Sequence, residues 1–411
     1  MTQDTDTTTL ARLLQGNATL LLDSLDLDLD GYIIRIRSNH APVIERLADY
    51  FSHVPRATAK PDIEILAIER EVFDPGLEFT DWAREPGKSG RKDACYDIPG
   101  ARVVLKVRTG MLFLQSESIR IAAGPCLQYD NQVINYINSQ YMNWLQHHGW
   151  LICHASGLEI NGHGVGLAGF SGGGKSTLML TLMDDDRVNY LTNDRLFIRP
   201  GDDGVQARGI PKLPRINPGT IVHNPALHGL LSRERREELL RLPPEELWHL
   251  EEKYDVQVDE VYGAGRITTE AALDSFVILN WQRESAGETS VAAVDIEKRR
   301  ELLAALMKSP GPFYQHTDGH FQQDTDDLDE QFAFAVDVRI ERRPQQAELV
   351  TEVAASTRLI KYLKANIDQR AKLGLGVRRH GARRCGGLEH ELGTTGPDML
   401  ARRQPGFVDV D

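Results

Sequence analysis

Residues 169 to 177 read Gly169-Phe170-Ser171-Gly172-Gly173-Gly174-Lys175-Ser176-Thr177, and no other stretch of the chain constrains the fold as strongly. It matches G-x-x-x-x-G-K-[S/T], in which glycines let backbone N–H groups converge on a phosphate. An apolar segment at 165–168 precedes it and a helical pattern at 177–183 follows it. Strand, glycine-rich loop and helix in this order deliver phosphate to a helix N-terminus. The sequence therefore predicts an α/β nucleotide-binding protein.

The loop assigns a role to each residue type. All nine residues from Gly169 to Thr177 are expected to surround the phosphates, with Lys175 reaching the outer ones and the Ser176 hydroxyl ligating a bridging Mg²⁺. A glycine-rich turn with a surface lysine is the plainer alternative. The same residues also fit G-x-S-x-G, but Ser171 inside a phosphate cradle is a poor candidate for a nucleophile.

The residues after the loop exclude two large classes. A GTPase would carry an Asn/Thr-Lys-x-Asp motif downstream and a transporter ATPase a Leu-Ser-Gly-Gly-Gln-like signature, and the chain has neither. Instead Leu191-Thr192-Asn193-Asp194-Arg195 follows about twenty residues after Lys175. This spacing places Asp194 at the end of a strand that comes soon after one helix.

Hydrophobic spacing outlines the rest of the chain. Before the loop, an amphipathic helix is expected at 131–146, and a hairpin of two strands, 102–107 and 111–115, turns at Thr109-Gly110. A turn followed by a strand is expected at 28–37, and other strands at 63–68, 150–154, 157–160, 190–192, 196–198, 276–279 and 332–340. Helices are expected at 43–51, 232–252, 296–307 and 346–367, and a linker at 85–93. The predicted domains are 1–90, a small α/β unit, and 91–370, a phosphate-loop domain. Residues 371–411 read as a disordered tail.

Composition narrows the setting. Charged residues make up 26% of the 411 residues and the net charge is −13, so the chain lacks the basic surface of a nucleic-acid binder. No apolar run reaches the ~18 residues of a membrane span, and the polar, acidic start does not resemble a leader. Four cysteines without a Cys-x-x-Cys pair favour a reducing cytoplasm. We expect neither nucleic acid nor membrane as a partner.

Three separated motifs together resemble one family. Cys153-His154-Ala-Ser-Gly-Leu-Glu159, the glycine-rich loop and Asn193-Asp194-Arg195 are similar to the HPr kinase/phosphorylase family, closest to its HPr-kinase-related kinase B branch. The resemblance is specific over residues 150–200 and extends through 209–219 and 276–281. It implies the fold of phosphoenolpyruvate carboxykinases, with the loop in a mixed sheet. It also implies transfer of phosphate from ATP to a hydroxyl, which in the founding family is a serine of a carrier protein.

The resemblance also implies roles for single residues. His154 matches a histidine near the reacting phosphate, and Asp194 matches an acidic residue that holds Mg²⁺ directly or through water. Asn193 stands where the founding family has an aspartate, a proposed proton acceptor, and an amide cannot act as that base. Asn193 then orients the acceptor or completes the metal site, with Asp194, His154 or Glu159 as base, or else the chain binds nucleotide and reacts poorly.

A second basic cluster follows the site. Lys212 and Arg215 lie between prolines in a rigid loop that could neutralise phosphate or hold an acidic acceptor, although ordinary surface cations would look the same. Taken together, the sequence predicts an ATP- and Mg²⁺-dependent kinase acting on a hydroxyl, mainly serine, of a protein or peptide. A nucleotide-binding regulatory module with weak ATPase activity is the alternative. The resemblance further implies a homo-oligomer.

Overall fold

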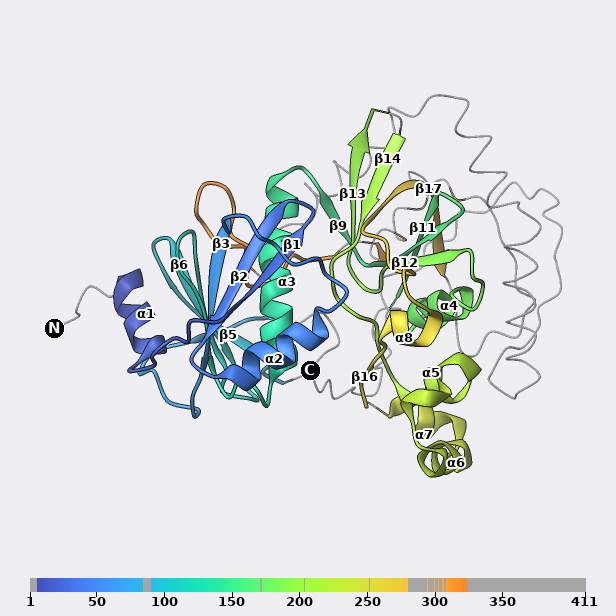
Figure 1. Cartoon of the computed structure of the whole chain (residues 1–411), viewed down its shortest axis with the longest axis horizontal. Coiled ribbons are helices and arrows are strands. Elements are labelled where there is room, and N and C mark those ends of the chain that lie inside the picture. Colours follow the sequence, from blue (N-terminus) through green and yellow to red (C-terminus); the bar gives the residue numbers. More distant parts are fainter. Residues whose placement is uncertain are drawn as a thin grey trace, which may run out of the picture.

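The structure, a computed structural model, describes residues 6–83, 90–170, 172–202, 204–250, 252–279 and 308–323, and also positions 294, 299, 302, 305 and 306. Two large β-sheets form the main body of the described chain, one from the N-terminal part and one around the glycine-rich loop (Figure 1). The expected α/β class is confirmed. Within the described residues, no helix is long and apolar enough to span a membrane.

The first sheet has eight strands in the order β1-β2-β3-β8-β7-β6-β5-β4. The pairs β2–β3 and β3–β8 are parallel and the other pairs are antiparallel. Its strands are β1 (Ser24–Leu29), β2 (Tyr32–Ser38), β3 (Ile63–Glu69), β4 (Thr80–Asp81), β5 (Asp93–Ile98), β6 (Ala101–Lys106), β7 (Leu112–Ser116) and β8 (Arg120–Gly124). Strands on both sides of residue 90 belong to this sheet, so the sheet itself has no break there. The domain division stays a prediction.

The alternation of leucine and aspartate before residue 31 is that of a half-buried strand. Leu25, Leu27 and Leu29 of β1 are buried, whereas the aspartates between them point to the other face. The Asp28 carboxylate accepts a hydrogen bond from the backbone N–H of Gly31 at 2.7 Å, and Gly31 has a φ of 89°. The acidic run therefore builds a strand and its turn.

Helix α3 (Asp130–His147) packs against the first sheet and is more deeply buried than its amphipathic pattern suggested. Its polar side chains find partners there: the Tyr136 hydroxyl donates to the carbonyl of Leu114 at 2.5 Å, and Gln140 donates to the Gln115 side chain at 2.7 Å. These bonds satisfy polar groups that would otherwise be costly to bury. The other N-terminal helices are α1 (Thr7–Gln15) and α2 (Ala41–Tyr50).

The second sheet carries the loop and has seven strands in the order β12-β10-β11-β17-β14-β13-β9. The loop strand β11 pairs in parallel with β17 and antiparallel with β10, so the sheet is mixed, as the resemblance implied. Its strands are β9 (Leu151–Cys153), β10 (Ala155–Ile160), β11 (His163–Gly169), β12 (Val188–Thr192), β13 (Leu196–Gly201), β14 (Gly204–Arg208) and β17 (Glu270–Leu279). Helix α4 (Lys175–Leu182) begins directly after the loop.

Some elements differ from the sequence prediction. The long helix expected at 232–252 is two helices, because Pro243 and Pro244 interrupt it. Strand β5 begins at Asp93, the last residue of the predicted linker. Strand β14 was not predicted. The smaller elements are α5 (Pro218–Val222), a 3-10 helix (Pro225–Leu230), α6 (Arg233–Arg241), α7 (Pro244–His249), α8 (Val258–Tyr262) and the short pair β15 (Arg215–Ile216) and β16 (Tyr254–Asp255). The elements predicted at 332–340, 346–367 and 371–411, and most of 296–307, lie outside the described residues.

Candidate nucleotide-phosphate site

The glycine-rich loop turns tightly between β11 and α4. Gly172 and Gly174 have φ angles of 74° and 85°, a region that suits glycine. At Gly173 a Cβ atom would lie 2.9 Å from the carbonyl oxygen of Phe170, closer than side chains tolerate. The sequence therefore supplies glycine where this backbone path requires it. Ser171 lies outside the described residues.

The Lys175 side chain folds back over the loop. Its Nζ donates to the carbonyl oxygens of Gly169 at 2.7 Å and Phe170 at 3.4 Å, and the residue is 8% exposed. Burial lowers the pKa of Lys175, Asp194 opposes this change and Lys308 adds to it. The ammonium group thus sits at the loop, where an outer phosphate could replace the carbonyl oxygens as its partner.

The two residues after the lysine differ in their surroundings. Ser176 is half-buried in the first turn of α4. The Thr177 hydroxyl is 3.0 Å from that of Thr220 in α5, so it links the two helices. Thr177 therefore has a structural contact in addition to the nucleotide role predicted for it.

His154 and Asp194 meet beside the loop. His154 follows β9 and Asp194 follows β12, and these positions come together because β10 pairs antiparallel with β12. The His154 Nε2 lies 3.2 Å from Asp194 Oδ1, with 20% and 39% of the two side chains exposed. The structure thus brings together two residues that the sequence analysis selected from separate motifs.

Cations surround the Asp194 carboxylate. Lys308 Nζ lies 3.6 Å and Arg195 Nε 3.9 Å from its Oδ2. Desolvation favours a higher pKa for Asp194, but Lys308, His154 and Arg195 outweigh it and hold that pKa well below its ordinary value. Asp194 is therefore ionised at neutral pH, as a metal ligand must be.

Asn193 is fixed from behind by Ser156, a residue that the sequence analysis did not select. The Ser156 hydroxyl, fully buried in β10, lies 2.5 Å from the Asn193 backbone oxygen and 3.4 Å from its Oδ1. Ser156 lies within the His154-Ala-Ser-Gly stretch quoted above. A small polar side chain in an otherwise apolar strand is the one feature of the sequence that could have indicated it. Lys308 gave no such signal, because no motif surrounds it.

Lys212 and Arg215 have partners within the second half of the chain. Arg215 Nε lies 3.3 Å from Asp255 Oδ1, between the paired strands β15 and β16. The Lys212 carbonyl accepts a hydrogen bond at 2.6 Å from the Tyr190 hydroxyl of β12. These contacts hold the basic loop against the strand that leads to Asn193. Its predicted role in binding an acceptor stays a prediction.

The segment after β14 presses closely on the same strand. A Cβ atom at Gly209 would lie 1.9 Å from the carbonyl oxygen of Leu191. Only glycine permits this approach of two backbones. Gly209 thereby fixes the end of β12, immediately before Asn193 and Asp194.

The donor set fits a nucleotide-bound Mg²⁺ better than a metal held by protein alone. Among the described residues, no group of three or more His, Cys, Asp or Glu side chains could hold a metal. Mg²⁺ in nucleotide sites uses one or two protein oxygens and completes its shell with phosphate and water. Ser176 and the partly exposed Asp194 carboxylate can supply those oxygens.

Known proteins offer only a weak structural likeness to this chain. No family model and no curated protein sequence matches the chain. Among solved structures, the Hpr(Ser) kinase/phosphatase from Coxiella burnetii is similar with a TM-score of 0.19 and 14% sequence identity. The overlap covers 31% of this chain and 58% of that one, less than two thirds of its length. An overlap of this size assigns neither fold family nor activity.

Proposed function

We propose that the chain is a cytoplasmic kinase that transfers a phosphoryl group from ATP to a hydroxyl, mainly serine, of a protein or peptide. In this proposal residues 91–370 form a kinase domain related to phosphoenolpyruvate carboxykinases, and the chain self-associates. The observation that carries the proposal is the glycine-rich loop with Lys175 at the start of α4 and the His154–Asp194 pair beside it.

The chain's own residues have separate tasks in such a transfer. Backbone N–H groups of the loop and the N-terminus of α4 bind the phosphates, and Lys175 neutralises the outer ones. Ser176 and Asp194 would hold Mg²⁺, which neutralises charge on the transferred group when bound. Phosphoryl transfer depends mainly on this positioning and charge neutralisation. Asn193, fixed by Ser156, supports the proposal as a group that orients the acceptor hydroxyl.

The proton acceptor is the His154–Asp194 pair. Asp194 is ionised and contacts His154 at 3.2 Å, so a hydroxyl proton can pass to the histidine while the carboxylate stabilises the resulting charge. Asn193 cannot take this proton, because a side-chain amide does not accept a proton near neutral pH.

A nucleotide-binding regulatory module with weak ATPase activity is the second candidate. The observation that favours it is Asn193 itself, an amide at the position where the family that the sequence resembles has a carboxylate. Such a module would bind ATP through the same loop and release phosphate slowly without an acceptor.

The first prediction tests the loop with Lys175→Met. We expect this variant to lose at least about ten-fold in affinity for MgATP, because a charge-assisted contact to phosphate contributes about 1.5–3 kcal/mol. Affinity is measured by displacement of a fluorescent ATP analogue, and Lys60→Met, an exposed lysine before β3, is the matched control. Unchanged affinity in Lys175→Met would refute the nucleotide site.

Transfer is tested separately from binding. Chain purified with Mg²⁺ and γ-labelled ATP is incubated with a lysate, and labelled proteins are separated. A kinase labels a discrete acceptor in a Lys175-dependent manner, whereas a regulatory module releases labelled phosphate at the same rate with or without lysate.

A further inference from the structure

Lys308 brings a distant part of the chain to the phosphate site. Its Nζ lies 3.6 Å from Asp194 Oδ2, and its side chain is 18% exposed. Just before it, the Leu306 carbonyl accepts a hydrogen bond at 2.7 Å from the backbone N–H of His154. We call residues 308–323 the strap. It begins at the candidate site and runs to the first sheet, against which it lies in Figure 1 (orange).

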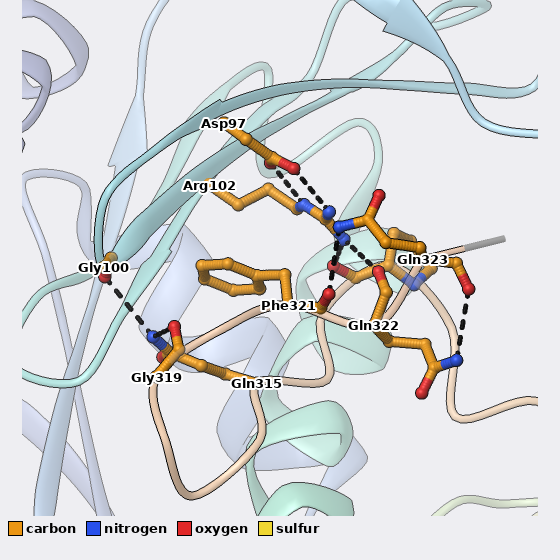
Figure 2. Close-up of polar contacts among 9 residues, drawn as sticks. Asp97, Gly100, Arg102, Gln315, Gly319, Phe321, Gln322 and Gln323 are labelled. Atoms are coloured by element: carbon orange, nitrogen blue, oxygen red, sulfur yellow. Dashed lines mark hydrogen bonds and ion pairs between the residues drawn. The ribbon is translucent and has the colours of Figure 1, made fainter. Parts of the chain in front are cut away.

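Arg102 of β6 anchors the far end of the strap. Its guanidinium pairs with both oxygens of Asp97, at 2.6 and 2.7 Å, and donates to the strap carbonyl of Gln322 at 2.9 Å (Figure 2). It also donates to the strap carbonyl of Pro312 at 3.0 Å. Arg102 is only 1% exposed, and its Cζ atom lies 4.8 Å from the centre of the Phe321 ring. A buried guanidinium needs these acceptors, so the strap and Arg102 fix each other.

Helix α3 provides a second anchor. Asn143 Nδ2 donates to the Phe313 carbonyl at 2.8 Å, and His147 Nε2 lies 2.7 Å from the Gln315 carbonyl oxygen. The Phe313 ring is 8% exposed and packs edge-on against Phe113 and Tyr136, at 5.5 and 5.0 Å between ring centres. The strap therefore contributes to the core of the N-terminal part.

The described charges at the site favour the binding of a polyanion. Lys308 Nζ and Arg195 Nε lie 3.6 and 3.9 Å from the Asp194 carboxylate, and the charge of Lys175 at the loop also interacts with it. Among the residues that the structure describes here, one carboxylate faces three cations, so these four groups together carry a net positive charge. A triphosphate supplies the missing negative charge, and its outer phosphates gain most from two lysines.

We propose that Lys308 contacts the outer phosphates of the bound nucleotide, and that Arg102 and Asn143 are positioning residues that hold it there through the strap. The first sheet then determines how tightly the loop binds a polyphosphate. This inference rests on the proposed nucleotide site. It extends that site to residues that no motif marks.

Lys308→Met tests the contact. ATP, ADP and AMP are each titrated against the fluorescent analogue with full-length chain. Affinity for ATP falls about ten-fold, as expected for one charged contact, while affinity for AMP changes little. Lys308→Arg recovers most of the ATP affinity, and Lys60→Met leaves all three unchanged. An equal loss for AMP, or no loss for ATP, would overturn the contact with the outer phosphates.

The positioning role is tested by combining variants. Asn143→Leu weakens ATP binding by less than Lys308→Met, and the double variant binds ATP no more weakly than Lys308→Met alone, because both act through one group. Arg102→Met is the second anchor variant, used where thermal unfolding shows that it folds. Additive losses in the double variant would refute positioning through Lys308.

Failure of this inference is distinguishable from failure of the proposed function. If Lys175→Met weakens ATP binding and Lys308→Met does not, the nucleotide site stands and the strap has no part in it. If neither variant weakens ATP binding, the proposed function itself fails.

Discussion

Asp194 is the residue on which most of the site's charges converge. It faces His154, Lys308 and Arg195, and these groups lower its pKa against the opposing effect of desolvation. A carboxyl whose pKa is lower in the folded chain stabilises folding above its unfolded pKa of about 3.9. That stabilisation is lost as pH falls through the folded pKa.

This sign gives a prediction for Asp194→Asn in metal-free buffer. At pH 7 the variant should be less stable than the parent by about 1 kcal/mol or less, because 39% of the side chain is exposed and water screens the pairs. The difference should shrink toward zero as pH falls from the unfolded pKa of about 3.9 through the lower folded pKa. Urea unfolding at several pH values measures it, and a difference that grows in acid would contradict the assigned ion pairs.

At the residue scale, sequence reasoning found what local motifs encode. The loop, His154 and Asp194 were predicted from separate motifs, and the structure places His154 3.2 Å from Asp194 and folds Lys175 back over the loop. Lys308 was missed because its contact with Asp194 joins segments far apart in the chain, and no periodicity records such a contact. Ser156 was missed because a buried serine in a strand resembles many others.

At the scale of elements, the strand that ends before Asn193 depends on a single glycine. Gly209→Ala would place a methyl group 1.9 Å from the Leu191 carbonyl oxygen, and neither backbone can move freely, because Leu191 lies in β12 and the Gly209 N–H donates to the Thr269 carbonyl at 3.0 Å. We expect a loss of about 2–4 kcal/mol in unfolding free energy, the range of overpacked buried sites. Gly229→Ala, where a Cβ would meet nothing within 4 Å, is the matched control. Thermal unfolding compares the two, and equal stabilities would disprove the close approach.

Most element types and the β6–β7 hairpin followed from the sequence pattern, while several boundaries and the other strand pairings did not. The predicted helix at 131–146 became α3, and the hairpin turning at Thr109-Gly110 became β6 and β7. The long helix at 232–252 was wrong because the pattern of charges continued across two prolines. Strand β5 was hidden because its sequence begins in a charged, glycine-containing stretch, and its pairing with β6 decides its structure.

At the scale of the whole molecule, Asp30 in the β1–β2 turn connects the part of the chain around the first sheet with the part around the second sheet, and we call these parts the two halves. Its carboxylate accepts hydrogen bonds from Tyr141 of α3 at 3.1 Å and from Thr269 beside β17 at 3.2 Å, and Arg208 of β14 lies 3.8 Å away. The first sheet therefore contacts the second through its β1–β2 turn as well as through the strap.

Asp30→Asn tests this connection while keeping a residue that tolerates the positive φ of 55° found there. We expect a loss of about 1–2 kcal/mol, since a neutral amide is a weaker acceptor and no longer pairs with Arg208. Calorimetry should also show a broader transition, because the halves then unfold less cooperatively. Asp62→Asn serves as a control that stays within the N-terminal part, because Asp62, immediately before β3, accepts a hydrogen bond from the backbone N–H of Ile33 in β2. A sharper transition in Asp30→Asn would argue against the connection.

The pairing of β11 with β17 has a consequence for the chain as it is synthesised. The loop strand ends at Gly169, but its parallel neighbour is complete only at Leu279. At the usual ~5–20 residues per second, roughly 5–20 s separate the two on the ribosome. During that interval one edge of β11 is open to any strand nearby, including that of another nascent chain. Nucleotide binding at the loop would therefore have to wait until β17 has paired with β11. A chaperone that binds exposed apolar strands would bind β11 during this interval.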